Sequence, residues 1–162
     1  MHASAPSGAG AVLAKQRGIM TTITRSALVM HSAEQMFDLV NDVRRYPEFL
    51  DGCKKTEVID EGDDFIKATL TISKAGINQS FSTHNRLVHP EKMEMELLDG
   101  PFTRFHGVWH FQKLSDDACK VSLDMEFEVA NKITGMALSA VFKQVANMMV
   151  DSFVKRAKEI YG

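Results

Sequence analysis

Hydrophobic and polar residues alternate one by one through most of the segment 66–129. This pattern is typical of antiparallel strands that have one buried and one solvated face. Turn-forming residues separate the alternating segments, as at 60–64 (DEGDD) and 99–101 (DGP), and short turns join neighbouring strands as hairpins. The pattern therefore predicts a meander of about six strands. On the last strand the predicted buried residues are Val121, Leu123, Met125, Phe127 and Val129.

After Asn131 the apolar residues recur every three or four positions instead. This spacing predicts an amphipathic helix from about Lys132 to Tyr161, with Asn131 as its N-cap. At about 1.5 Å per residue the helix would be roughly 45 Å long, which is enough to cross the sheet. Its apolar stripe consists of Leu138, Val141, Phe142, Val145, Ala146, Met149, Phe153, Ala157 and Ile160.

A strand and two short helices are expected before the meander. The segment 21–30 is rich in Thr, Ile and Val and predicts a first strand. Ser32 and Gln35 have the spacing of a capping box, which would begin a short helix. Asp42 is a candidate N-cap for a second short helix. Pro47 should end that helix, because a proline disfavours helical conformation in the residue before it.

These elements predict an α+β fold in which a curved antiparallel sheet wraps a long C-terminal helix. A chain of 162 residues fits a single domain. A strongly bent sheet covered by one helix does not easily fill its interior, and the two short helices could close one end. The order therefore favours an internal cavity that holds an apolar ligand. The alternative is that the same inward residues simply form a packed core.

The amino-acid composition limits the cellular compartments and the binding partners to be expected for this protein. The formal net charge is -2, which gives no general attraction to DNA. No segment approaches the roughly 20 apolar residues of a membrane-spanning helix. Cys53 and Cys119 match no metal or redox spacing and suit a reduced, cytoplasmic setting. Residues 1–19 are small, rich in Gly, Ala and Ser, and unlike a secretory signal, so they are predicted to be a disordered extension to a domain at 20–162.

The sequence offers little for catalysis. His106 and His110 share a strand face but would lie about 13 Å apart at the rise of a strand, too far to bind one metal ion. The chain has no glycine-rich phosphate loop and no Gly-x-Ser-x-Gly turn. No base is evident beside Cys53. The sequence therefore predicts no enzyme activity, no metal and no cofactor.

Three segments in a fixed order resemble a known family. They are 46–53 (YPEFLDGC), 100–111 (GPFTRFHGVWHF) and 142–158 (FKQVANMMVDSFVKRAK). Together they resemble the coenzyme Q-binding branch of the START-like, polyketide-cyclase superfamily, over residues 20–162. The resemblance implies the helix-grip fold, which matches the element order above. Asp51 stands where that family commonly has proline, which predicts a more mobile loop at the cavity mouth.

The resemblance implies functions of different classes. Mitochondrial members bind ubiquinone as lipid chaperones and support respiration, and such a role would include transient contact with a membrane surface. Bacterial members are described as ribosome-association toxins that bind the large ribosomal subunit and block subunit joining. Polyketide relatives are cyclases or aromatases, but their chemistry needs polar groups inside the cavity, and the sequence does not place any there. We expect ubiquinone or a similar isoprenoid lipid as the ligand, with ribosome association as the alternative.

The two functions would use different residues. Ribosome binding would use outward basic residues, and lipid binding would use inward apolar ones. Arg44, Arg45 and Tyr46 are also candidates for the polar groups that hold a quinone head at the entrance. The candidates for partner binding are Arg44, Arg45, Lys54, Lys55, Lys155, Arg156 and Lys158. The candidates for ligand binding are Tyr46, Phe49, Met93, Met95, Phe102, Phe105, Trp109, Phe111, Met125, Phe127, Phe142, Val145, Met149 and Phe153.

Overall fold

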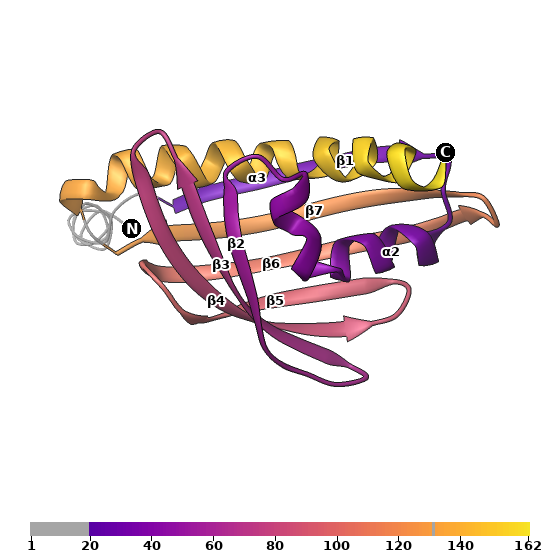
Figure 1. Cartoon of the computed structure of the whole chain (residues 1–162), viewed down its shortest axis with the longest axis horizontal. Coiled ribbons are helices and arrows are strands. Elements are labelled where there is room, and N and C mark those ends of the chain that lie inside the picture. Colours follow the sequence, from indigo (N-terminus) through magenta and orange to yellow (C-terminus); the bar gives the residue numbers. More distant parts are fainter. Residues whose placement is uncertain (1–19, 131) are drawn as a thin grey trace, which may run out of the picture.

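The computed structural model describes residues 20–130 and 132–162, and it confirms the helix-grip architecture (Figure 1). The predicted extension at 1–19 and the predicted N-cap Asn131 lie outside the described residues. The strands are β1 (Met20–Val29), β2 (Cys53–Glu61), β3 (Phe65–Lys74), β4 (Ile77–Val88), β5 (Lys92–Asp99), β6 (Phe102–Ser115) and β7 (Ala118–Val129). The helices are α2 (Ala33–Asn41), the 3-10 helix η1 (Val43–Glu48) and α3 (Lys132–Tyr161).

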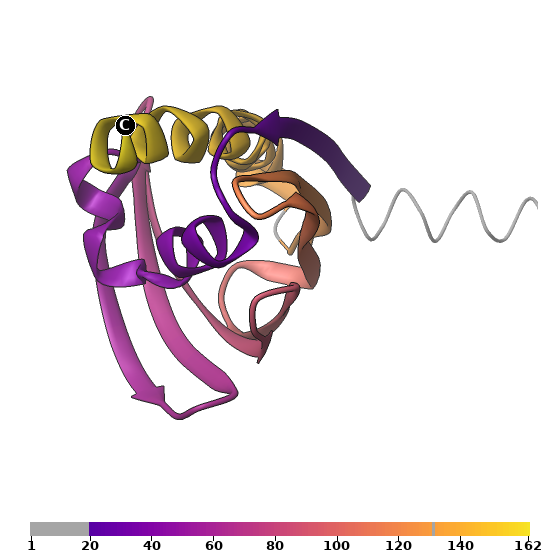
Figure 2. The ribbon, with the colours of Figure 1, turned by 90° about the vertical axis from the view of Figure 1, so that its right-hand side faces the viewer.

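All seven strands form one antiparallel sheet in the order β1-β7-β6-β5-β4-β3-β2. The strands β2 to β7 are the predicted meander, because each pairs with its neighbour in sequence. The first strand pairs with the last one instead, from Met20 opposite Glu128 to Val29 opposite Cys119. This pairing places β1 beside α3, and the sheet curls from there round to β2 (Figures 1 and 2).

The core lies between the concave face of the sheet and α3. Two of its large side chains, Trp109 of β6 and Phe153 of α3, are 1% and 0% exposed, and their rings meet edge to face with centroids 5.4 Å apart. Helix α2 lies across the open end of the curled sheet (Figure 2). Its buried residues include Phe37, which packs against Phe111 at 5.4 Å.

The beginning of α2 forms as predicted. The Ser32 hydroxyl accepts a hydrogen bond from the backbone N–H of Gln35, and the Gln35 side chain accepts one from the backbone N–H of Ser32, both at 3.0 Å. These two bonds are a complete capping box. No helix of the described residues is both long and apolar enough to cross a membrane.

The second short helix differs from the prediction. Asp42 makes no side-chain capping bond to η1, and its carboxylate instead contacts Arg45 at 3.2 Å. The helix does not end before Pro47 but includes it and continues to Glu48. A short 3-10 turn tolerates proline, because few N–H groups of so short a helix have a partner within it. The turn is closed by Leu50, whose N–H donates to the carbonyl of Tyr46 at 2.8 Å.

Candidate functional site

A small cavity lies between the concave face of the sheet and the middle of α3. Its volume is about 50 Å³. The walls come from η1, from strands β3 to β7 and from α3, so that the end of the chain and its first third meet around one space. The lining residues are Val43, Tyr46, Leu50, Leu70, Ile72, Phe81, Thr83, Asn85, Met95, Phe105, Trp109, Met125, Phe127, Phe142, Val145, Ala146 and Met149.

Most of the residues predicted to bind a ligand line this cavity. On the strands these are Met95, Phe105, Trp109, Met125 and Phe127, and on the helices they are Tyr46, Phe142, Val145 and Met149. They lie on β5, β6, β7, η1 and α3, so the alternation of the strands and the helical stripe together identified the correct faces. The cavity thus occupies the middle of the predicted interior.

The other predicted ligand-binding residues lie elsewhere. Met93, Phe102, Phe111 and Phe153 are buried in the core and do not line the cavity. Phe102 and Phe111 pack near the two ends of β6, and the ring of Phe153 is held against Tyr46 at 5.3 Å. Phe49 is half-buried and lies beneath the guanidinium of Arg156, 5.0 Å from it. Side-chain periodicity cannot separate these positions from cavity positions, because it reports only the side of the element that a residue faces.

Strand β4 contributes cavity residues that the sequence prediction missed. Phe81, Thr83 and Asn85 alternate along this strand and are 8%, 4% and 5% exposed. The polar types of Thr83 and Asn85 hid the alternation. The spacing of two residues from Phe81 was the available signal, since it places both on the inward face. The further missed lining residues are Val43, Leu50, Leu70, Ile72 and Ala146.

Thr83 and Asn85 form a buried polar pair on an otherwise apolar wall. The Thr83 hydroxyl donates a hydrogen bond to Oδ1 of Asn85 at 2.9 Å. The Asn85 amide nitrogen lies 3.9 Å from the thioether sulfur of Met93. The cavity therefore holds polar groups, although neither of them titrates in the ordinary pH range.

Gly107 of β6 leaves room for two methionine side chains that approach its backbone closely. A Cβ at this position would lie 2.6 Å from the terminal methyl of Met95 and 3.5 Å from that of Met125. The three residues are directly opposite one another on β5, β6 and β7. The approaching groups are therefore flexible methionine side chains, which can move when the cavity is filled.

Tyr46, Arg44 and Arg45 were predicted to hold a quinone head at the entrance. The Tyr46 hydroxyl donates a hydrogen bond to the backbone carbonyl of Val40. Burial raises the pKa of Tyr46, and the nearby thiol of Cys53 acts in the same direction. Tyr46 therefore contributes its aromatic ring to the cavity wall, whereas its hydroxyl is already engaged by Val40. Arg44 and Arg45 are exposed on η1 and do not line the cavity.

Comparison with known proteins places this architecture in a family. The family described as polyketide cyclase / dehydrase and lipid transport matches residues 29–154. The chain belongs to this family. Its members include proteins with very similar sequences. The ribosome association toxin RatA of Pseudomonas aeruginosa is 47% identical over 142 residues, which cover 88% of this chain and 99% of RatA.

More distant similarities are found in one curated sequence and in one solved structure. The mitochondrial coenzyme Q-binding protein COQ10 of Drosophila melanogaster is 24% identical over 143 residues, covering 86% of this chain and 59% of COQ10. Among solved structures, the Zhui aromatase/cyclase from Streptomyces sp. R1128 superposes with a TM-score of 0.78 at 18% identity, covering 89% of this chain and 97% of Zhui. That likeness concerns the fold alone.

Some structures of this fold are therefore enzymes, whereas RatA and COQ10 are named for association and binding. Among the described residues that line the cavity, Tyr46 is the one with a titratable side chain, and its hydroxyl is hydrogen-bonded to the backbone carbonyl of Val40. General acid–base catalysis in the cavity would have to use that group. The absence of enzyme activity stays a prediction.

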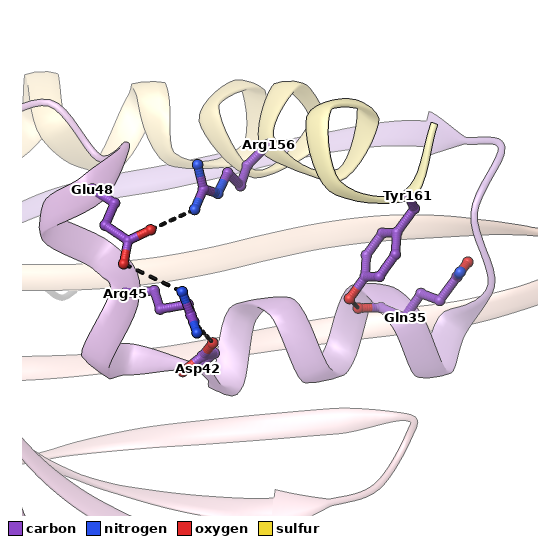
Figure 3. Close-up of polar contacts among 6 residues, drawn as sticks. All are labelled: Gln35, Asp42, Arg45, Glu48, Arg156 and Tyr161. Atoms are coloured by element: carbon purple, nitrogen blue, oxygen red, sulfur yellow. Dashed lines mark hydrogen bonds and ion pairs between the residues drawn. The ribbon is translucent and has the colours of Figure 1, made fainter.

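The basic residues predicted to bind a partner fall into two groups. Arg44 forms a bidentate pair with Glu61, at 3.2 and 2.9 Å. Arg156 and Arg45 both contact Glu48, at 2.7 and 3.4 Å (Figure 3). These arginines therefore join η1 to β2 and to α3 within the protein. The lysines Lys54, Lys55, Lys155 and Lys158 are exposed and form no ion pair with any residue that the structure describes.

Proposed function

We propose that this protein associates with the ribosome. The observation that carries the proposal is the 47% identity to the ribosome association toxin RatA, which extends over 99% of that protein. Similarity of this degree from end to end supports a shared surface as well as a shared fold. The distant and partial match to COQ10 supports a quinone-binding role much less.

Exposed lysines are the best candidates for contact with ribosomal RNA. The arginines are engaged with carboxylates, whereas Lys54 and Lys55 on β2 and Lys155 and Lys158 on α3 are exposed. The start of β2 lies near α3, since a Cβ on Gly52 would be 3.0 Å from a methyl of Val145. The two lysine pairs therefore belong to neighbouring elements.

The distribution of charge along β2 also favours the end of this strand near α3 as the ribosome-binding end. Lys54 and Lys55 begin the strand, and the hairpin at its other end carries Asp60, Glu61, Asp63 and Asp64. This acidic hairpin projects away from α3 (Figure 2). It would be repelled by RNA phosphates, so we propose that the α3 end of β2 is the end that approaches the ribosome.

The test is co-sedimentation with purified ribosomes and with separated subunits at several salt concentrations. We expect binding to the large subunit, inhibition of subunit joining, and an affinity that falls steeply with salt, because lysine–phosphate pairing releases counterions. Reversal of two lysines in K54E/K55E should weaken binding and lower the salt slope by about one for each lysine–phosphate pair that the substitution removes. The control K113E/K120E makes the same change in charge at the hairpin that joins β6 and β7 and should bind normally. Equally weakened binding in both variants would show that only net charge matters.

We also propose that the cavity binds an apolar molecule, which could be ubiquinone or another isoprenoid lipid. The mostly apolar lining and membership of a family described by lipid transport support this second function. The volume of about 50 Å³ is several times smaller than that of drug-sized pockets. Binding would therefore require movement of methionines or of η1. Mass spectrometry of lipids extracted from the purified protein is the test, and absence of any copurifying lipid would weigh against an isoprenoid quinone.

A further inference from the structure

The polar pair on β4 lies where a ligand in the cavity would meet it. Thr83 and Asn85 are buried, at 4% and 5% exposed, and both line the cavity. Burying an amide among aromatic and methionine side chains is costly unless its hydrogen-bonding capacity is used. A core that is only packed would need neither polar group. Their position on the cavity wall therefore indicates a hydrogen-bond partner inside the cavity.

The hydrogen bonds of Asn85 leave part of its donor capacity unused. The Thr83 hydroxyl donates to Oδ1 at 2.9 Å and so fixes the orientation of the amide. The two hydrogens of Nδ2 then have one acceptor among the described residues, the Met93 sulfur at 3.9 Å. A thioether sulfur is a weak acceptor. An oxygen atom that enters the cavity would be a better partner for this amide.

No other lining group competes for such an oxygen among the described residues. The Tyr46 hydroxyl already donates to the Val40 carbonyl, and the remaining lining residues are hydrophobic. No Lys, Arg or His lines the cavity within the described residues, so an anionic ligand would lack a counter-charge. The fitting ligand is thus neutral and apolar and carries one exposed acceptor.

We propose that Asn85, oriented by Thr83, is the anchor for the carbonyl oxygen of an apolar ligand such as an aromatic ketone or a quinone. This inference rests on the proposed binding function of the cavity and specifies which ligands it selects. The amide Nδ2 donates to the carbonyl, while Met95, Met125 and Met149 rearrange around the apolar body.

The test uses two probes that differ in one group. Acetophenone carries C=O where α-methylstyrene carries C=CH2, so their shapes match. Dissociation constants for both are measured by NMR titration of the Trp109 indole N–H, in the natural protein and in T83V/N85L. The double substitution removes both partners of the hydrogen bond with side chains of similar shape, which is close to neutral for folding. The variant T71V/S80A is the control, since it removes the Thr71–Ser80 hydroxyl pair of β3 and β4, joined at 2.7 Å outside the cavity.

We expect T83V/N85L to bind the ketone about threefold to tenfold more weakly relative to the hydrocarbon, and the control to leave this ratio unchanged. In the natural protein the Asn85 side-chain N–H resonance should shift on addition of acetophenone but not of α-methylstyrene, a readout that needs no variant. If both probes bind and neither the ratio nor the resonance responds, the anchor is refuted while the cavity function survives. If neither probe binds, the cavity function itself fails and the anchor fails with it.

Discussion

Arg156 of α3 holds Glu48 of η1, with 2.7 Å between Nη2 and Oε1 (Figure 3). The same carboxylate contacts Arg45 at 3.4 Å, and Arg45 contacts Asp42 at 3.2 Å. The Arg156 guanidinium also covers the Phe49 ring at 5.0 Å. These contacts fasten η1, which supplies the Val43 and Tyr46 wall of the cavity, to the long helix. We therefore expect these contacts to oppose any movement of η1 away from α3.

Arg156→Ala should loosen η1 without unfolding the protein. The Glu48 side chain is 48% exposed but that of Arg156 only 19%, so the variant loses an ion pair that contributes about 0–1 kcal/mol and also the packing of Arg156 on Phe49. We expect acrylamide to quench Trp109 fluorescence more strongly in the variant, because Trp109 lies behind η1 on the cavity wall. Arg86→Ala is the control, since it removes exposed ion pairs with Glu94 and Glu96 on the outer sheet face. Identical quenching in both variants would show that Arg156 does not fasten η1.

Gly107→Ala should reduce the cavity without unfolding the protein. The new Cβ would lie 2.6 Å from the Met95 methyl, and that flexible chain end can move into the cavity. Ligand affinity should fall. The free energy of unfolding should decrease by no more than about 1–3 kcal/mol, which is the usual cost of overpacking a core. Gly135→Ala is the matched control, because its Cβ would meet no atom of the described side chains closer than 3.8 Å and alanine favours the helix. Unchanged ligand affinity in Gly107→Ala would place the ligand elsewhere.

Ser32→Ala should destabilise the protein by about 1 kcal/mol, since it removes the cap of α2. The backbone N–H of Gln35 then has no side-chain acceptor at the first turn. Ser26→Ala, on the exposed face of β1, should have almost no effect. Urea denaturation of the three proteins measures the difference. A destabilisation equal to that of Ser26→Ala would mean that solvent replaces the cap.

Cys53 and Cys119 should be unreactive in the folded protein. Burial raises the pKa of each thiol from 9.0 to about 11, although a backbone contact at Lys55 opposes the shift for Cys53. A thiol with a raised pKa in the folded state stabilises the fold fully below its unfolded pKa, and that contribution is lost as the pH rises from about 9 toward 11. Labelling with a thiol reagent at pH 8 should therefore require denaturation. Between pH 8 and pH 10.5 the free energy of unfolding should fall less in the variant C53A/C119A than in the natural protein. Rapid labelling of the folded protein would contradict the burial of these groups.

The local patterns of the sequence determine the elements and their faces. Alternation from Ile66 to Val129 predicted the meander, helical spacing predicted α3, and Ser32 with Gln35 predicted the beginning of α2. These features depend on residues close in sequence, and a residue's side of its element follows from backbone geometry alone. The three aligned residues Met95, Gly107 and Met125 face inward for that reason, as do Trp109 and Phe153.

The tertiary structure alone decided where the interior stays open and which charges remain free. Phe105 and Phe111 lie on the same face of β6, yet the curvature of the sheet puts Phe105 on the cavity wall and Phe111 against Phe37. Thr83 and Asn85 become a polar pair in the cavity because β4 lies opposite α3. The arginines are paired because carboxylates distant in sequence, such as Glu61 for Arg44 and Glu48 for Arg156, reach them. Periodicity cannot report these relationships, since they depend on how far the sheet bends and on which distant segments that bend brings together.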